Sequence, residues 1–209
     1  MAVKEIGRLH VITDTVLQCR YSHEDLARLA IAGGAGAIQF RQKQGSTREL
    51  IETARAMLAV CRRLGIPLIV NDRLDVALAV GAGGVHLGQD DFPMAQAREI
   101  LGPNRIIGGS ASTLEEARLC RAQAVDYIGL GPVYPTGSKA DASPAGGLDL
   151  VRRVSRELDL PVIAIGGIGA ANAPEVLAAG AYGVAVISAV CCQDDPSAAA
   201  ANLLRALRG

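Results

Sequence analysis

Short β-rich runs alternate with helical stretches along the chain, and this alternation restricts the fold more than any other feature. Eight runs are recognised, each followed by a helical stretch: 9–13, 37–40, 67–70, 84–87, 105–107, 126–130, 161–165 and 183–187. Alternating strands and helices indicate a parallel sheet. Eight units favour closure into a single (β/α)8 TIM barrel of α/β class. The alternative is an open doubly wound sheet, but no G-x-G-x-x-G motif follows the first run to support it.

Capping residues mark the starts of several predicted helices. Ser22, Ser46 and Ser112 each precede an acidic residue by three positions. This spacing lets a side-chain oxygen accept hydrogen bonds from the first free N–H groups of a helix. Asp195 precedes Pro196, and proline is favoured at the first helical position. We therefore expect a helix to begin after each of these four residues.

Composition limits both the core and the partners of this chain. With 209 residues, it lies at the short end for a (β/α)8 barrel, so we expect residues 1–209 to form one catalytic domain. Half of the residues are hydrophobic but only 3% are aromatic, so aliphatic side chains must build the core. The 21 basic residues balance the 21 acidic ones, which argues against a nucleic-acid or membrane-surface role. We therefore expect the partners to be small-molecule substrates. Assembly into a homo-oligomer is compatible with the sequence.

The cysteines indicate the compartment. An odd count of five, with no C-x-x-C spacing, is typical of reduced thiols in the cytoplasm. Adjacent Cys191 and Cys192 are interpreted as two small side chains near a helix start, with a redox pair as the alternative. The N-terminal residues contain no apolar signal core, and no apolar run is long enough to span a bilayer.

Active sites of (β/α)8 barrels lie at the carboxyl ends of the strands, so the residues that follow each run are the candidates. After the second run, Gln39, Arg41 and Lys43 alternate along the chain and therefore share one face. Two cations and an amide on one face suit a phosphate ligand. A solvated charged loop explains this segment alone equally well.

Acidic residues follow the third and fourth runs. Asn71 and Asp72 come after one run, and Asp90 and Asp91 come after the next. Carboxylates gathered near cations suggest a Mg²⁺ ion that bridges to substrate phosphate oxygens. The competing interpretation is that one of Asp90 and Asp91 caps the following helix.

Gly108, Gly109 and Ser110 follow the fifth run, where glycine followed by a hydroxyl suits the close approach of a phosphate, and Ser112 is a possible helix cap.

The ends of the sixth, seventh and eighth runs predict a second phosphate site, without metal. The long segment 131–146, which follows the sixth run, contains Thr136, Ser138 and Lys139. Loops this long inside a compact domain are usually functional. Gly166-Gly167 and Ser188 follow the last two runs, where backbone N–H groups often bind phosphate in these barrels.

No nucleophile constellation is recognised. His10, His23 and His86 are interpreted as structural, without a serine or cysteine partner at a familiar spacing. Two phosphate sites and no nucleophile suit the joining of a diphosphate to a monophosphate.

Taken together, the strand-end motifs resemble the thiamine-phosphate synthase family over nearly the whole chain. The motifs are Gln39-Phe-Arg-Gln-Lys43, Val70-Asn-Asp-Arg73, Val85-His-Leu-Gly-Gln-Asp-Asp91, Gly131-Pro-Val-Tyr-Pro-Thr136 with Lys139, Ile165-Gly-Gly-Ile168 and Val186-Ile-Ser188. The resemblance implies a transferase of thiamine biosynthesis that uses Mg²⁺. Its substrates would be hydroxymethylpyrimidine diphosphate and thiazole phosphate. The implied mechanism is dissociative: diphosphate leaves first, and the thiazole nitrogen then captures the pyrimidinylmethyl carbocation.

The resemblance also implies a role for individual residues. Implied contacts to the pyrimidine diphosphate are Gln39, Phe40, Arg41, Gln42, Lys43, Asn71, Ser110 and Lys139. Implied contacts to the thiazole phosphate are Thr136, Gly137, Ser138, Gly167, Ile187 and Ser188. Asp72 and Asp91 would hold the metal. Arg41, Lys43, Lys139 and Ser110 are the expected catalytic group, because the reaction needs charge neutralised on the leaving group.

Two positions depart from the family pattern. Ser138 stands where threonine is common, which keeps the hydroxyl, and Ser112 stands where histidine is common. Related thiazole tautomerases rely on that histidine and tend to lose the metal residues, so this chain fits them less well. A non-catalytic ligand-binding barrel is the third hypothesis, and the neutral composition offers it no partner surface.

Overall fold

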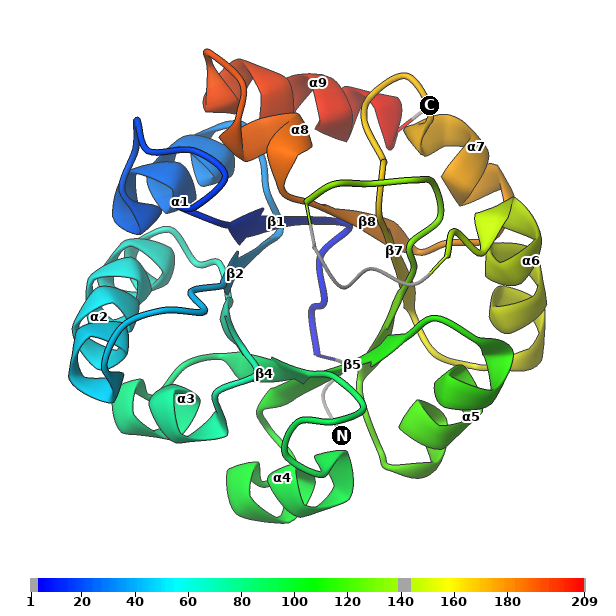
Figure 1. Cartoon of the computed structure of the whole chain (residues 1–209), viewed down its shortest axis with the longest axis horizontal. Helices are drawn as coiled ribbons and strands as arrows, with labels where there is room; N and C mark the ends of the chain where they lie inside the picture. Colours follow the sequence, from blue (N-terminus) through cyan, green and yellow to red (C-terminus); the bar gives the residue numbers. More distant parts are fainter. Residues whose placement is uncertain (1–3, 139–143, 209) are drawn as a thin grey trace.

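Eight parallel strands form a closed barrel in the computed structural model, which describes residues 4–138 and 144–208 (Figure 1). The strands are β1 (Leu9–Thr13), β2 (Ala37–Phe40), β3 (Leu68–Asn71), β4 (Gly84–Leu87), β5 (Ile106–Ala111), β6 (Tyr127–Leu130), β7 (Val162–Ile165) and β8 (Gly183–Val186). They follow one another in chain order around the barrel, and β8 pairs with β1 through Val186 and Val11. The expected closed barrel is therefore confirmed, and the open-sheet alternative is excluded.

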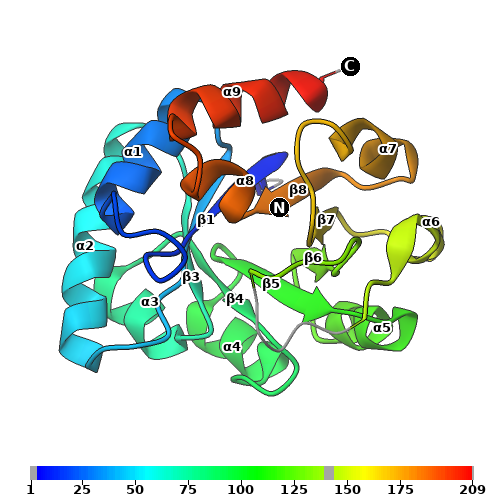
Figure 2. The same ribbon diagram turned by 45° about the horizontal axis from the view of Figure 1, so that its top comes forward.

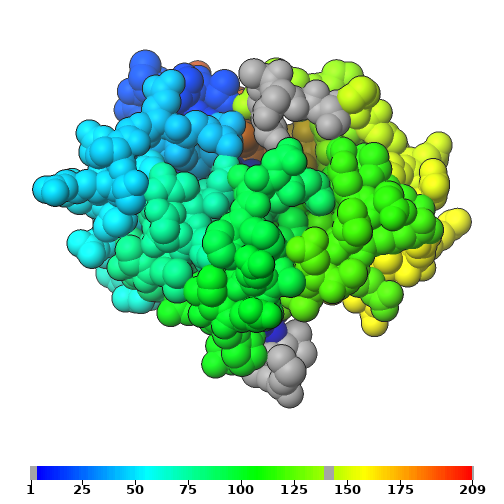
Figure 3. Space-filling view, turned by 60° about the horizontal axis from the view of Figure 1, so that its bottom comes forward, coloured from blue at the N-terminus to red at the C-terminus, as the bar shows by residue number. Residues whose placement is uncertain are grey.

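Helices surround the strands as an outer ring (Figures 1 and 2). They are α1 (His23–Ala32), α2 (Thr47–Arg63), α3 (Leu74–Val80), α4 (Met94–Leu101), α5 (Leu114–Ala122), α6 (Gly147–Glu157), α7 (Ala173–Ala178), α8 (Ser188–Cys191) and α9 (Pro196–Ala206). Figure 3 shows part of this outer wall on the side of α3, α4 and α5. No helix in the described part of the chain is long and apolar enough to cross a membrane.

Three of the four predicted helix caps are confirmed. Ser22 and Asp195 accept hydrogen bonds from the third residue of their helices, and Ser46 forms a reciprocal capping box with Glu49. The prediction for Ser112 is wrong by one residue, because Thr113 caps α5 through the backbone N–H of Glu116. Ser112 instead donates to the Glu116 carboxylate through both its hydroxyl and its backbone N–H.

Alternation along the strands divides the core into two layers. The larger layer lies between strands and helices, and includes Val85 and Leu87 of β4. The smaller layer fills the barrel interior, and includes Ile69 of β3 and Tyr127 of β6. Because successive side chains point to opposite faces of a strand, His86 is turned toward the interior while its two neighbours face the helices.

Several strands begin or end one residue away from the expected position, and two larger differences concern β5 and the segment after β8. β5 continues to Ala111, so Gly108, Gly109 and Ser110 lie within the strand rather than after it. Glycine weakens the β-strand signal, which explains why the strand was expected to stop early. A short additional helix, α8, separates β8 from α9 and begins at Ser188.

Candidate active site

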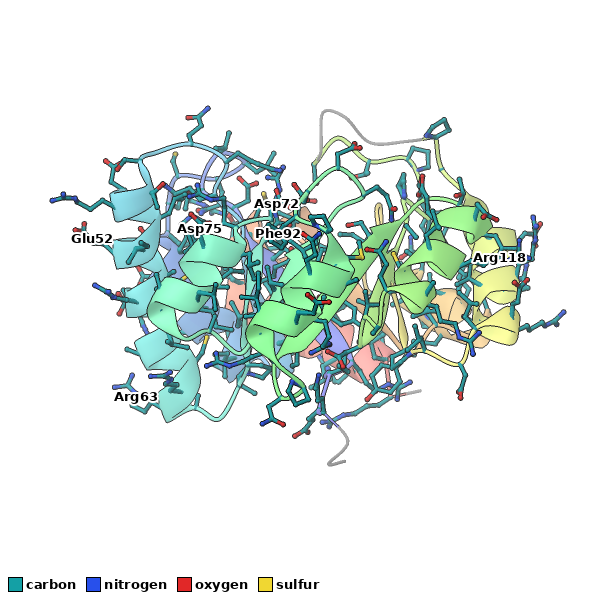
Figure 4. All side chains as sticks on the ribbon, turned by 90° about the horizontal axis from the view of Figure 1, so that it is seen from below. Glu52, Arg63, Asp72, Asp75, Phe92 and Arg118 are labelled. Atoms are coloured by element: carbon teal, nitrogen blue, oxygen red, sulfur yellow. The ribbon has the colours of Figure 1, made fainter. Side chains whose placement is uncertain are left out.

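A cavity of about 770 Å³ opens at the carboxyl ends of the strands. Most of the predicted site residues line it: Gln39, Arg41, Lys43, Asn71, Asp72, Asp91, Ser110, Thr136, Ser138, Gly167, Ile187 and Ser188. These residues come from every quarter of the chain and meet because the carboxyl ends of parallel strands share one face of the barrel. Figure 4 shows Asp72 toward the upper rim, and Arg63 at the end of α2 far below it.

Two carboxylates and a cation form an acidic corner of the cavity. Lys43 pairs with Asp72, which follows β3 and adopts a φ of 62°, a left-handed conformation that is uncommon for residues other than glycine. Desolvation raises the pKa of Asp91, and the neighbouring Asp72 carboxylate raises it further, although the Gly88 N–H and the Lys43 ammonium act in the opposite direction. A bound cation would favour the charged form of Asp91, which burial and the neighbouring carboxylate disfavour.

The acidic corner offers the carboxylate oxygens of Asp72 and Asp91 as ligands for a cation. Among the described residues, no group of three or more histidine, cysteine or acidic side chains is placed to hold a metal. Mg²⁺ needs fewer protein ligands, since it retains water and takes further oxygens from substrate phosphates. The alternative role of Asp90 or Asp91 as a helix cap is not observed, because α4 has Pro93 at its N-cap position and no side-chain cap. Asp91 instead accepts a hydrogen bond from the Gly88 N–H at 2.7 Å.

Arg41 is held by a carboxylate that the sequence analysis did not consider. Asp14 follows β1 and is only 2% exposed, and its Oδ2 pairs with the Arg41 guanidinium. Its other oxygen accepts hydrogen bonds from the backbone N–H groups of Val16, at 2.9 Å, and Leu17, at 3.1 Å. The position of Asp14 directly after a strand is the same signal that revealed the other residues. Arg41 is thus fixed in the cavity wall by a buried, fully bonded partner.

His86 contacts two hydroxyl groups inside the barrel. Its Nε2 lies 2.9 Å from the Ser110 hydroxyl, and its Nδ1 lies 2.9 Å from the Tyr127 hydroxyl. Ser110 lies 24 positions along the chain, which is not a familiar nucleophile spacing, so the pair is not evident from the sequence. Both Ser110 and His86 line the cavity, and they lie on the neighbouring strands β5 and β4.

The other two histidines lie deeper. His10 is buried with Nε2 2.7 Å from the Ile6 carbonyl oxygen, and burial lowers its pKa to about 4. His23 bonds Thr13 through Nδ1 at 2.7 Å, and burial also lowers its pKa to about 4, despite the nearby Asp14. His10 lines the base of the cavity but His23 does not.

The second half of the cavity is built from glycines and hydroxyls. Gly166 and Gly167 follow β7 with φ angles of 99° and 64°, which L side chains rarely adopt. A Cβ on Gly167 would lie 2.7 Å from Cβ of Tyr134, so this backbone is closely packed against the segment that follows β6. The Ser138 hydroxyl donates to the Ser188 hydroxyl at 3.2 Å and joins that segment to the start of α8.

Three predicted site residues in the described part of the chain do not line the cavity. Phe40 is buried among the core side chains outside the barrel, with its ring against His23. Gln42 bonds the Gln44 carbonyl oxygen, and Gly137 lies between two lining residues without lining the cavity. Lys139 lies outside the described residues.

The cysteines are free thiols in the described part of the chain. Cys191 is buried and donates to the Ile12 carbonyl oxygen at 3.4 Å, and burial raises its pKa to about 12. Cys192 is half-buried and lines the cavity. The two small side chains pack as expected, but they lie at the end of a helix: Cys191 is the last residue of α8 and Cys192 is its C-cap.

Comparisons with known proteins show the family of this chain. A family model described as thiamine monophosphate synthase matches residues 9–190. The chain belongs to the thiamine-phosphate synthase family. Thiamine-phosphate synthase of Methanocella arvoryzae is 55% identical over 195 residues, which cover 93% of this chain and 92% of the relative. The synthase of Chloroflexus aurantiacus is 50% identical over 196 residues, which cover 94% and 90%.

Solved structures extend the comparison to three dimensions. Thiamine phosphate pyrophosphorylase from Pyrococcus furiosus matches with a TM-score of 0.89 at 42% identity, covering 98% of this chain and 96% of that one. A 3-hexulose-6-phosphate synthase matches with a TM-score of 0.69 at 19% identity, which shows a shared fold alone. Membership of the thiamine-phosphate synthase family makes the chain a transferase of thiamine biosynthesis, as the motifs predicted.

Proposed function

We propose that this chain, acting as one domain, joins hydroxymethylpyrimidine diphosphate to thiazole phosphate and releases thiamine phosphate and diphosphate. The observation that carries the proposal is the division of one cavity into an acidic corner with Lys43, Asp72 and Asp91, and a glycine and hydroxyl wall at Gly167 and Ser188. A diphosphate with its metal suits the first part, and a monophosphate suits the second.

Each half of the cavity has a distinct task in this reaction. Arg41 and Lys43 would bind the diphosphate and neutralise the charge that develops as the C–O bond to the pyrimidine methylene breaks. Asn71 and Ser110 would position the same substrate, and Asp72 and Asp91 would hold Mg²⁺. When bound, Mg²⁺ supplies further charge neutralisation on the leaving diphosphate.

The remaining wall would align the second substrate. Thr136, Ser138 and Ser188 offer hydroxyl donors to the thiazole phosphate, while Gly167 permits a close backbone approach. Holding both substrates in one cavity places the thiazole nitrogen near the pyrimidinylmethyl cation, which it captures with its lone pair. A dissociative path of this kind needs charge stabilisation and alignment, and no covalent attachment to the protein.

The test is formation of thiamine phosphate from the two substrates. Activity should fall by at least about a hundredfold with EDTA or with Asp91→Ala, the scale expected when an electrostatic stabiliser of developing charge is removed. Asp149→Ala, at an exposed carboxylate on α6 paired with Arg152, is the matched control and should leave the rate unchanged. Activity that survives both EDTA and Asp91→Ala would refute the metal role.

The variant Arg41→Ala tests whether the two halves of the cavity have different roles. Because Arg41 lies beside the proposed diphosphate position, the variant should slow diphosphate departure more than it weakens thiazole phosphate binding. An equal loss of both would contradict this assignment.

A further inference from the structure

A chain of buried polar side chains crosses the barrel interior beneath Ser110. Tyr127 is 1% exposed and lies on β6, and His86 is 9% exposed and lies on β4. The imidazole lies 2.9 Å from the Tyr127 hydroxyl through Nδ1 and 2.9 Å from the Ser110 hydroxyl through Nε2. Buried polar groups in such networks are costly unless they are bonded, so an extended chain of this kind calls for a functional explanation.

Glycines in the barrel wall make room for this network. A Cβ on Gly129 would lie 2.7 Å from Cε1 of His86, and one on Gly108 would overlap both His86 and Tyr127. Gly108 and Gly129 lie in the interiors of β5 and β6, where glycine weakens a strand and often marks a close approach by another group. β5 and β6 therefore carry no side chain at these two positions, and the rings of His86 and Tyr127 occupy the space.

The direction of the hydrogen bonds follows from the far end of the chain. Tyr127 is the outer hydroxyl of the chain, 2.9 Å from Nδ1 of His86. A phenol is more acidic than an aliphatic hydroxyl such as that of Ser110, and is therefore the stronger hydrogen-bond donor and the weaker acceptor. Donation from the Tyr127 O–H to Nδ1 places the imidazole proton on Nε2.

We infer that Tyr127 and His86 are positioning residues that fix Ser110 as a hydrogen-bond donor to the pyrimidine diphosphate. The Nε2–H of His86 donates to the Ser110 oxygen, so the Ser110 hydroxyl proton points into the cavity. The same polarity prevents His86 from removing that proton, and Ser110 therefore does not act as a nucleophile. This inference rests on the proposed function only for the identity of the substrate.

The backbone of Ser110 is held as firmly as its side chain. Nε2 of Gln89 donates to the Ser110 carbonyl oxygen at 2.6 Å, and the thiol of Cys120 donates to the same oxygen at 3.4 Å. The main chain of Ser110 is fixed on one side and its hydroxyl oxygen on the other. The hydrogen-bond chain from Tyr127 through His86 to Ser110, called the relay below, therefore fixes the direction of the Ser110 O–H bond. Preorganised donors of this kind stabilise charge without reorganisation during the reaction.

The tautomer of His86 provides a test that does not depend on activity. The chain has three histidines, so ¹⁵N NMR of the imidazole nitrogens is readily assigned with His86→Gln. In the ligand-free protein at neutral pH, we expect the proton on Nε2 of His86, and a mixture of tautomers in Tyr127→Phe. A proton on Nδ1 in the unsubstituted protein would overturn the inference, whether or not the enzyme makes thiamine phosphate.

Kinetics test the consequence for Ser110. Tyr127→Phe should lower kcat about three- to tenfold, the worth of one hydrogen bond, without changing KM for thiazole phosphate. In a Ser110→Ala background it should cause no further loss. Tyr182→Phe, at a 42% exposed tyrosine before β8, is the control and should have wild-type kinetics.

Two results would contradict the relay. An equal loss from Tyr127→Phe with and without Ser110 would mean that the tyrosine acts only through the stability of the barrel. A covalent substrate adduct on Ser110, detected by mass spectrometry, would mean that the serine is a nucleophile. Failure of the unsubstituted enzyme to form thiamine phosphate would instead refute the proposed function, and the NMR result would still decide the polarity of the relay.

Discussion

Replacing Asp14 by asparagine tests how the cavity holds its principal cation. Asparagine keeps one oxygen to accept from the Val16 and Leu17 N–H groups, and it removes the charge that faces Arg41. The substitution therefore isolates the ion pair from the turn that the same side chain stabilises.

The expected loss in the free energy of unfolding follows from the burial of the Asp14–Arg41 ion pair. The Asp14 side chain is 3% exposed and that of Arg41 is 17% exposed. Removing one partner of a fully buried pair costs about 3–5 kcal/mol, and a hydrogen bond to a charged group contributes about 1.5–3 kcal/mol. Because Arg41 borders the cavity and regains water when released, we expect a loss of about 2 kcal/mol in the free energy of unfolding.

Urea denaturation followed by circular dichroism measures this loss, since the chain contains no tryptophan for fluorescence. An Arg41 that is no longer held should also lower kcat about tenfold, with KM for thiazole phosphate unchanged. The control is Asp194→Asn, which removes a fully exposed carboxylate paired with Arg20 and should change stability by less than about 0.5 kcal/mol.

The double variant Asp14→Asn with Arg41→Gln completes a double-mutant cycle, which measures the interaction between the two residues. Asp14→Asn should cost little in that background, because the guanidinium that it faces is already gone. If Asp14→Asn alone behaves like Asp194→Asn, or if its cost is the same with and without Arg41, the argument from the buried pair is refuted.

Two further predictions concern stability. Because burial lowers the pKa values of His10 and His23 to about 4, the unfolded chain binds more protons between pH 6.5 and 4, and stability should fall across that window as the pH falls. Each histidine contributes on the order of 3 kcal/mol to that fall, so His10→Phe should flatten the pH profile of urea denaturation, and an unaltered slope would contradict the assignment. Gly129→Ala should cost about 1–3 kcal/mol by overpacking, measured by the same assay. Its control, Gly169→Ala, meets no atom within 4 Å, and an equal cost in both variants would remove the steric argument.

Local sequence patterns were sufficient for the architecture and for much of the cavity wall. Strand and helix periodicity, together with the caps at Ser46 and Asp195, are properties of neighbouring residues and can be read along the chain. The rule that strand ends share one face then placed Arg41, Asp72 and Asp91 in one cavity before any contact was known.

The contacts across the barrel depended on the tertiary structure. Whether Asp14 meets Arg41, and whether His86 meets Ser110, depends on the register between strands and on which face each side chain takes. Sequence spacing cannot reveal these pairs, because strand pairing brings together residues that are 27 or 24 positions apart. The sequence by itself therefore determined the barrel and the residue types at its mouth, and the closed packing of the strands decided which of those residues act on one another.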